Sequence, residues 1–152
     1  MTILVSACLL GENCKYNGGN NRNEEVLKLL DDPNLQIIPV CPEQLGGLQT
    51  PRDPSEIRGN RVFAKNGRDV TMSFLTGASL ALYDAMAKGV DAALLKNGSP
   101  SCGTTRIYDG TFTGVNIPGQ GMTARLLAAN HIPLFSEENL GDFVEWLKQN
   151  QK

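Results

Sequence analysis

Thr2-Ile3-Leu4-Val5-Ser6-Ala7 is a short and largely apolar run that predicts a buried β-strand at the start of the chain. Similar runs follow at residues 35–40, 91–96 and 131–135. Helical patterns alternate with them at residues 23–30, 71–88 and 122–130, and again after Ser136 or Asn139. This alternation predicts an α/β fold with a mostly parallel, four-stranded, Rossmann-like sheet and helices on both of its faces.

The length and composition suit one compact domain. A chain of 152 residues that is 41% hydrophobic and 20% charged is long enough for one ordinary core and too short for two. We therefore expect a single domain over residues 1–152. The Asn66-Gly67 pair between residues 61–64 and 68–71 predicts a small hairpin insertion. The stretch after Val40 is rich in proline and predicts neither a helix nor a central strand.

The charge and the opening residues restrict the class of partner. A formal net charge of -2 argues against a strongly basic surface, so we expect no stable nucleic-acid partner. The first residues carry no basic segment and no apolar stretch long enough for a signal peptide or a membrane span. We expect a cytoplasmic protein that does not bind membranes. In that reducing compartment, the four cysteines are better explained as ligands, nucleophiles or buried residues than as disulfides.

Three cysteines follow predicted strands. Cys8, Cys41 and Cys102 come one to several residues after the apolar runs at 2–7, 35–40 and 91–96. The carboxyl ends of parallel strands meet at one rim of a sheet, where open α/β folds bind their ligands. Three thiols from distant parts of the chain can therefore share one site. The chain has no C-x-x-C pair, which favours a soft metal or an iron-sulfur cluster over a local zinc clip.

Polar side chains accompany two of these thiols. Glu43 lies two residues after Cys41, and the strand-end turn before Cys102 contains Ser99 and Ser101. A carboxylate and hydroxyls beside thiols are candidate catalytic groups. A solvated loop glutamate and an ordinary turn are the structural alternatives.

Three motifs occur in a fixed order along the chain. They are Ser6-Ala7-Cys8-Leu9-Leu10-Gly11 with Cys14 and Tyr16, Cys41-Pro42-Glu43 with Gly46-Gly47-Leu48 and Pro51-Arg52, and Ser99-Pro100-Ser101-Cys102-Gly103. Together they resemble the family of small proteins that includes thiouracil desulfidase. The resemblance extends from near residue 3 to near residue 135, and the agreement of three multi-residue motifs makes it specific.

The resemblance implies a 4Fe-4S cluster held by three cysteines, with one iron left open to bind the sulfur of a thiolated base. The substrate is then a small thiolated pyrimidine, either thiouracil or its nucleoside or nucleotide. The positions after three predicted strands favour Cys8, Cys41 and Cys102 as the ligands. Cys14 is then a nearby fourth thiol that is not a ligand and either has a structural role or protects the open iron.

The implied chemistry is removal of sulfur as sulfide without electron transfer. An open iron can polarise the C=S bond as metal ions polarise carbonyls, and water attack on the ring carbon then requires groups that manage protons. We expect Glu43 to be the general base or acid. We expect Ser99 to position water or substrate, with Ser101 in its place if the geometry points that hydroxyl inward.

Three further residues are candidate substrate contacts. Lys96 adjoins the Ser-Pro-Ser-Cys turn, and Lys96 and Arg52 can face a ribose phosphate if the substrate is a nucleotide. Gly121 belongs to a glycine-rich entry to a predicted helix, whose free amides can receive an anion. Solvated surface charges and an ordinary helix start are the structural alternatives.

A non-catalytic iron-sulfur or zinc binding module is the alternative function. Four thiolates can form a closed zinc site. A closed site needs all four cysteines equally for metal binding, whereas the enzyme needs Cys8, Cys41 and Cys102 and can retain its cluster without Cys14.

Overall fold

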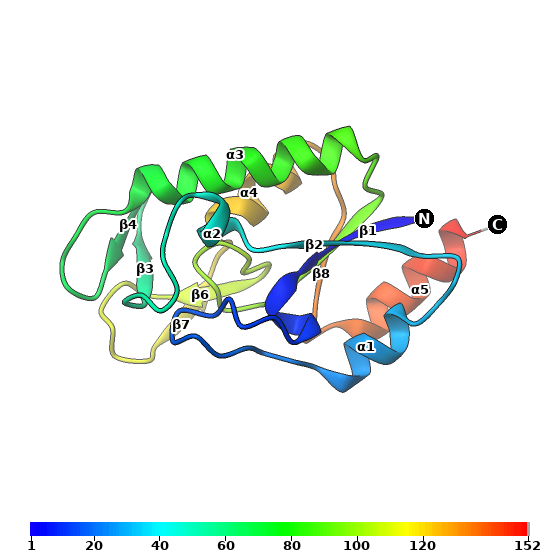
Figure 1. The fold of residues 1–152 in the computed structure, drawn as a ribbon, viewed down its shortest axis with the longest axis horizontal. Helices are drawn as coiled ribbons and strands as arrows, with labels where there is room; N and C mark the ends of the chain where they lie inside the picture. Colours follow the sequence, from blue (N-terminus) through cyan, green and yellow to red (C-terminus); the bar gives the residue numbers. More distant parts are fainter. Residues whose placement is uncertain (152) are drawn as a thin grey trace.

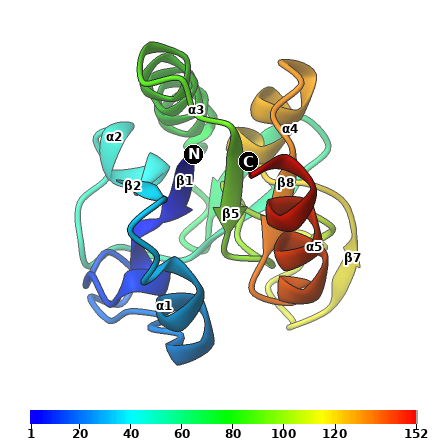
Figure 2. The ribbon, with the colours of Figure 1, turned by 90° about the vertical axis from the view of Figure 1, so that its right-hand side faces the viewer.

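The computed structural model describes residues 1–151. Its centre is a parallel four-stranded sheet (Figure 1). The strand order is β2-β1-β5-β8 (Figure 2). The predicted α/β fold with a four-stranded parallel sheet is therefore confirmed. The strands of this sheet are β1 (Thr2–Ser6), β2 (Gln36–Val40), β5 (Ala92–Leu95) and β8 (Leu134–Ser136).

Helices cover both faces of the sheet (Figure 2). One face carries α3 (Thr71–Ala87) and α4 (Met122–Ala129), and the other carries α1 (Glu24–Leu30) and α5 (Leu140–Asn150). A short 3-10 helix, η1 (Ala7–Leu10), follows β1 directly. The side chain of Asn23 accepts a hydrogen bond from the amide of Val26, so α1 begins where its capping residue and acidic first turn predict.

The central strands supply two hydrophobic cores. In β1, Ile3 and Val5 pack against α1 and α5, whereas Leu4 packs against α3 and α4. Every residue of β5 is buried. A strand that is covered on both faces needs apolar side chains at consecutive positions, which explains why these segments are continuous apolar runs in the sequence.

Helix α3 buries Phe74, Ala78 and Ala85, whereas Leu75 and Met86 of the same helix are 43% and 62% exposed. The buried face consists mainly of small residues, because α2 and α4 pack closely against it. Its members are Thr71, Phe74, Gly77, Ala78, Ala81 and Ala85.

Two antiparallel hairpins lie beside the sheet, at the end opposite the chain termini (Figure 1). The first joins β3 (Ser55–Arg58) to β4 (Arg61–Ala64), and the second joins β6 (Arg106–Tyr108) to β7 (Asn116–Pro118). The predicted hairpin turn at Asn66-Gly67 exists, and residues 68–70 pair with 62–64 through the bridge between Phe63 and Asp69 and through backbone hydrogen bonds from Ala64 to Arg68 and from Val70 to Val62. This pairing is short because Thr71 already begins α3, and the longer ladder of β4 is with β3.

A short helix, α2 (Pro42–Leu45), occupies part of the segment after Val40 for which no helix was predicted. Proline is tolerated in the first turn because the amides there have no partner within the helix.

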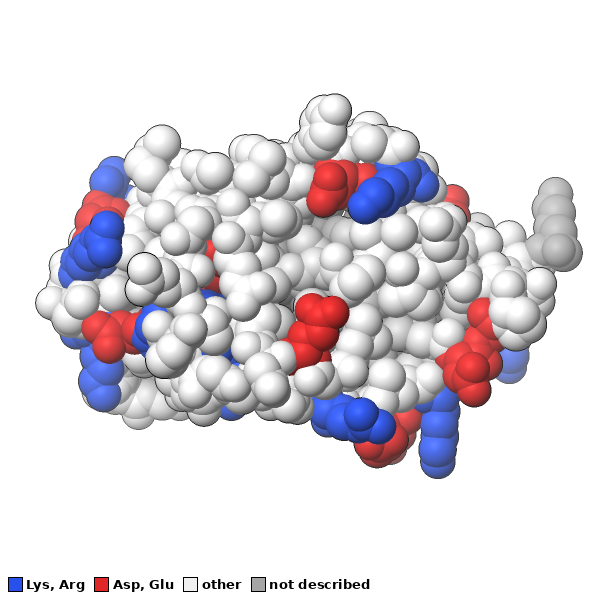
Figure 3. Space-filling view, viewed as in Figure 1, with Lys and Arg blue, Asp and Glu red and all other residues white. Residues whose placement is uncertain are grey.

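Acidic and basic side chains are interspersed on the face shown in Figure 3. Within residues 1–151, no helix combines the length and the apolar character needed to cross a membrane.

Candidate functional site

A cavity of about 410 Å³ lies at the carboxyl ends of the parallel strands, between the sheet and the two hairpins. The strand order reverses between β1 and β5, which is the position where open α/β sheets bind ligands. Side chains from the ends of both strands line the cavity, as do residues after β2. All four cysteines of the chain are among them: Cys8, Cys14, Cys41 and Cys102.

Cys8, Cys14 and Cys41 lie close together, and Sγ of Cys41 donates to the carbonyl oxygen of Cys14 at 3.8 Å. Hydrogen bonds from Cys14 lower the pKa of the Cys8 thiol and of the Cys41 thiol to about 7 in each case. The same contacts with Cys41 and Cys8 raise the pKa of Cys14, and burial adds to this effect. Nδ2 of Asn21 also donates to Sγ of Cys8 at 3.4 Å. The contact with Cys14 thus favours the thiolate forms of Cys8 and Cys41.

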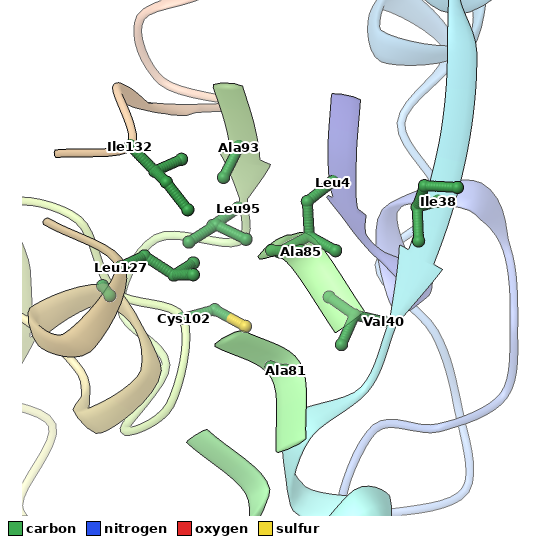
Figure 4. Packing of buried hydrophobic residues seen from close by; sticks show 11 residues of the cluster. Leu4, Ile38, Val40, Ala81, Ala85, Ala93, Leu95, Cys102, Leu127 and Ile132 are labelled. Atoms are coloured by element: carbon green, nitrogen blue, oxygen red, sulfur yellow. The ribbon is translucent and has the colours of Figure 1, made fainter. Parts of the chain in front are cut away.

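Cys102 lies in a more apolar environment. Its sulfur is buried in the core between the sheet and α3 and α4, near Leu127 and Ala81 (Figure 4). Desolvation by burial is the main cause that raises the pKa of this thiol to about 12. A bound metal centre would supply the positive charge that favours the thiolate, because coordinating thiols are deprotonated.

A chain of polar groups lies along the same cavity. Oγ of Ser101 donates to Oε2 of Glu43 at 2.9 Å, and Oγ of Ser99 lies 3.0 Å from Oγ of Ser101. Nε of Arg52 donates to Oε1 of Glu43 at 3.2 Å. The oxygen of Ser99 also accepts the amides of Ser101 and Cys102, at 3.1 and 3.0 Å. The Ser99 hydrogen therefore remains available for Ser101 or for a molecule in the cavity.

Two glycines allow α2, which carries Glu43, to approach α3. A Cβ atom on Gly46 would lie 2.0 Å from the carbonyl oxygen of Ser73. A Cβ atom on Gly77 would lie 1.9 Å from the carbonyl oxygen of Pro42. The two helices meet backbone to backbone, and this contact sets the position of Glu43 over the strand ends.

The turn that carries Ser99, Ser101 and Cys102 is held from two sides. Oδ1 of Asn97 accepts backbone amides at distances of 3.0 to 3.3 Å, and the first amides of α4 donate to carbonyl oxygens of the turn at 2.9 to 3.1 Å. The amides bound by Asn97 belong to Gly98, Thr104, Thr105 and Arg106. Those from α4 belong to Met122, Thr123 and Ala124.

Comparison with known proteins identifies the family. The model of the 2-thiouracil desulfurase family matches residues 3–139. The chain belongs to this family. The resemblance seen in its three sequence motifs is thus confirmed.

Two relatives match this desulfurase family member over nearly its whole length. The uncharacterized protein YbbK of Bacillus subtilis (strain 168) is 40% identical over 152 residues, which cover 93% of this chain and 99% of YbbK. The solved structure of the 4Fe-4S-dependent thiouracil desulfidase TudS is 44% identical, with a TM-score of 0.91. That match covers 97% of this chain and 98% of TudS.

The thiols of this desulfurase family member fit an iron-sulfur cluster. Cys8, Cys41 and Cys102 follow three adjacent parallel strands, line one cavity and are free of disulfides. Thiolates are the ligands that hold 4Fe-4S clusters. Among the His, Cys, Asp and Glu side chains of residues 1–151, no group of three or more is arranged to hold a single metal ion.

The predicted cationic contacts line the cavity but have protein partners. Nζ of Lys96 lies 3.1 Å from Oε2 of Glu137 and donates to the carbonyl oxygen of Asn97 at 2.7 Å. The guanidinium group of Arg52 binds Glu43 and also donates to the carbonyl oxygen of Cys14 at 2.9 Å. Its other contacts are to Gln49 and Thr50. Arg52 is thus largely engaged in holding the cavity wall.

Gly121 has a packing role in place of the predicted substrate contact. It is absent from the cavity lining, and a Cβ atom on it would lie 2.5 Å from the carbonyl carbon of Ser101. The amides at the start of α4 already donate to the turn before Gly103. No amide of this helix start is left for an anion within residues 121–124, so the glycine serves close backbone approach.

Two residues of the site were missed from the sequence. Ser6 is buried, and its Oγ accepts the amide of Lys96 at 2.9 Å. A hydrogen bond between Ser6 and Cys102 partly opposes the rise that burial causes in the pKa of the Cys102 thiol. Asn97 organises the turn described above. A polar residue within two positions of the end of an apolar strand is the sequence signal common to Ser6 and Asn97, because it places a polar group at the ligand-binding rim.

Proposed function

We propose that this protein is a non-redox desulfidase that removes the sulfur of a thiolated pyrimidine, thiouracil or its nucleoside or nucleotide, as sulfide. The net reaction replaces C=S with C=O and consumes one water. The observation that carries the proposal is the arrangement of Cys8, Cys41 and Cys102 around the cavity that also contains Glu43 and Ser99. The family and the name of the TudS neighbour support the same assignment.

Cys8, Cys41 and Cys102 would hold a 4Fe-4S cluster. Such a cluster with one iron lacking a protein ligand supplies a Lewis acid that binds and polarises the thiocarbonyl sulfur. The chain's own contribution begins with the orientation of these thiols at three strand ends. Cys14 lies within hydrogen-bonding reach of Cys8 and Cys41, where it can restrain the ligands without joining them.

Glu43 is the proposed general base that takes a proton from the attacking water. The Arg52 guanidinium and the Ser101 hydroxyl hold its two oxygens in a fixed direction. Ser99 is the proposed contact to water or substrate, because Ser101 is only 2% exposed and lies between Ser99 and Glu43. The two hydroxyls can pass a proton between the cavity and Glu43.

Lys96 remains a proposed substrate contact at the edge of the cavity. Its side chain is 26% exposed, and its charge helps to lower the pKa of the Cys8 thiol. Arg52 is proposed to act mainly through Glu43. A zinc module with four thiolate ligands does not require the hydrogen-bonded side chains of Arg52, Glu43, Ser101 and Ser99. The enzyme is therefore the better supported function.

The substitution Glu43→Gln tests this function in protein reconstituted without oxygen. We expect iron and acid-labile sulfide near four of each per chain in wild type and variant alike. The rate of sulfide release from 2-thiouracil or 4-thiouracil should fall by about 100-fold or more, because glutamine cannot take a proton.

Glu145→Gln on α5 is the matched control, because Glu145 is exposed and lies outside the cavity lining. It should release sulfide at the wild-type rate. Unchanged turnover in Glu43→Gln would remove Glu43 from the mechanism. Zinc in place of iron and sulfide in the wild type would contradict the desulfidase itself.

A further inference from the structure

A second carboxylate, Glu56 on β3, lines the cavity and is only 8% exposed. Its Oε1 accepts the amides of Gly110 and Phe112, at 3.0 and 3.1 Å. Nε of Arg58 adds a third contact by donating to the carbonyl oxygen of Gly110 at 2.8 Å. These bonds fasten the loop between β6 and β7 to the first hairpin.

The other carboxylate oxygen, Oε2 of Glu56, has no protein donor and no ion pair within residues 1–151. It is also not enclosed by protein. In that part of the chain, the buried side-chain nitrogen and oxygen atoms without a partner are Oγ1 of Thr123 and Nε2 of Gln151. Oε2 therefore keeps some exposure to solvent, on a residue that lines the cavity. Largely buried carboxylates normally have donors for both oxygens, because desolvation of the charge is costly.

Phe112 lies beside this carboxylate and also lines the cavity. Its φ of 59° is in the left-handed region, which a bulky side chain rarely adopts, and the bond from its amide to Glu56 helps to hold it there. An acceptor with one free oxygen next to an aromatic side chain suits a flat heteroaromatic ring that carries an N–H group.

We propose that Glu56 binds the substrate through its free oxygen, which accepts a hydrogen bond from a ring N–H of the pyrimidine or from a hydroxyl of an attached ribose. Phe112 provides apolar wall beside the bound molecule. This inference rests on the proposed function and extends it, because it assigns recognition of the substrate to a residue separate from the acid-base chain at Glu43.

The substitution Glu56→Gln separates recognition from support of the loop. Glutamine keeps an oxygen that can accept the amides of Gly110 and Phe112, but it replaces the free acceptor with an N–H donor. Equilibrium dialysis of 4-thiouracil and of 4-thiouridine, together with steady-state kinetics, should show Kd and KM raised by about tenfold or more. We expect an unchanged iron content, and a kcat reduced much less than KM is raised. Glu145→Gln should match the wild type in every measurement.

The two ligands distinguish the two donors. Weaker binding of the free base identifies a ring N–H, whereas weaker binding of the nucleoside alone identifies a ribose hydroxyl. Binding of N3-methyl-4-thiouracil to wild type checks the first result without any substitution. Equal Kd values for wild type and Glu56→Gln with both ligands would overturn the proposal. All dialysis is done in a Glu43→Gln background, in which turnover is slow, so that it measures binding. A protein that binds these ligands through Glu56 but releases no sulfide when Glu43 is present would contradict the desulfidase alone.

Discussion

Asn97 shows how much of the site depends on one buried amide. Its side chain is 1% exposed, and Oδ1 accepts the amides of Thr104, Thr105 and Arg106 in addition to that of Gly98. Its Nδ2 donates to Oγ1 of Thr105 and Oε1 of Glu138, both at 2.8 Å. The loop after β5 has no regular secondary structure around Ser99. The side-chain hydrogen bonds of Asn97 therefore take the place of the backbone hydrogen bonds that a helix or a sheet would provide.

The substitution Asn97→Ala should lower the free energy of unfolding by about 2–4 kcal/mol, because it leaves several buried amides without an acceptor. It should also reduce the iron retained per chain, since the same loop carries Cys102. Urea unfolding of cluster-free protein and iron analysis measure the two effects. Asn150→Ala, at an exposed position on α5, should cost less than about 0.5 kcal/mol. Equal stability of the two variants would contradict the organising role of Asn97.

At the scale of elements, the contact between α2 and α3 links the core to Glu43, the proposed general base. The helix α2 spans only Pro42–Leu45 and is too short to be stable alone. It is held by the close approach at Gly46 and Gly77, where no Cβ atom fits. The position of Glu43 is therefore set by α3, a helix that contributes no side chain to the cavity lining.

Gly77→Ala should destabilise the protein although alanine is the better helix former. The new methyl group collides with the carbonyl oxygen of Pro42, and overpacking of this kind costs about 1–3 kcal/mol. Sulfide release should fall as Glu43 is displaced. Gly141→Ala is the matched control, because the added Cβ atom on α5 meets nothing within 4 Å. It should be neutral or stabilise by about 0.5–1 kcal/mol, as alanine does in a helix. A Gly77→Ala variant as stable and active as Gly141→Ala would refute this account.

At the scale of the whole molecule, the site lies at the rim of a fold whose cores do not depend on it. Two hydrophobic clusters cover the two faces of the sheet, and a third joins the hairpins to α3 and α4. Cys102 belongs to the first cluster, but the other three cysteines lie outside these clusters. A cluster bound to the strand ends would add stability to a fold that is already formed.

Removal of the cluster with a chelator under reducing conditions should therefore leave the protein folded. Far-UV circular dichroism should be nearly unchanged, and thermal unfolding should stay cooperative with a Tm lower by about 5 °C or more. Readdition of iron and sulfide should restore the Tm. Loss of the helical signal on chelation would show that the cores described here are insufficient without the cluster.

The sequence by itself determined the α/β class, the four strands and the family. Strand and helix periodicities are local properties, so the buried runs around Leu4 and Leu94 could be recognised without knowing their neighbours. The motifs around Cys8, Cys41 and Cys102 also carry enough specific residues for the family to be recognised, as the match over residues 3–139 confirms.

Only the tertiary structure decided which side chains meet and which are already engaged. The backbone amides of residues 121–124 donate to carbonyl oxygens of the turn at residues 100–103, and the guanidinium group of Arg52 is bound to Glu43. Neither is therefore the free anion contact that its sequence context predicts. The hydrogen bonds that Oε1 of Glu56 and the side chain of Asn97 make join segments far apart in the chain. Such contacts depend on how elements pack in three dimensions, and a pattern of hydrophobicity along one segment contains no information about them.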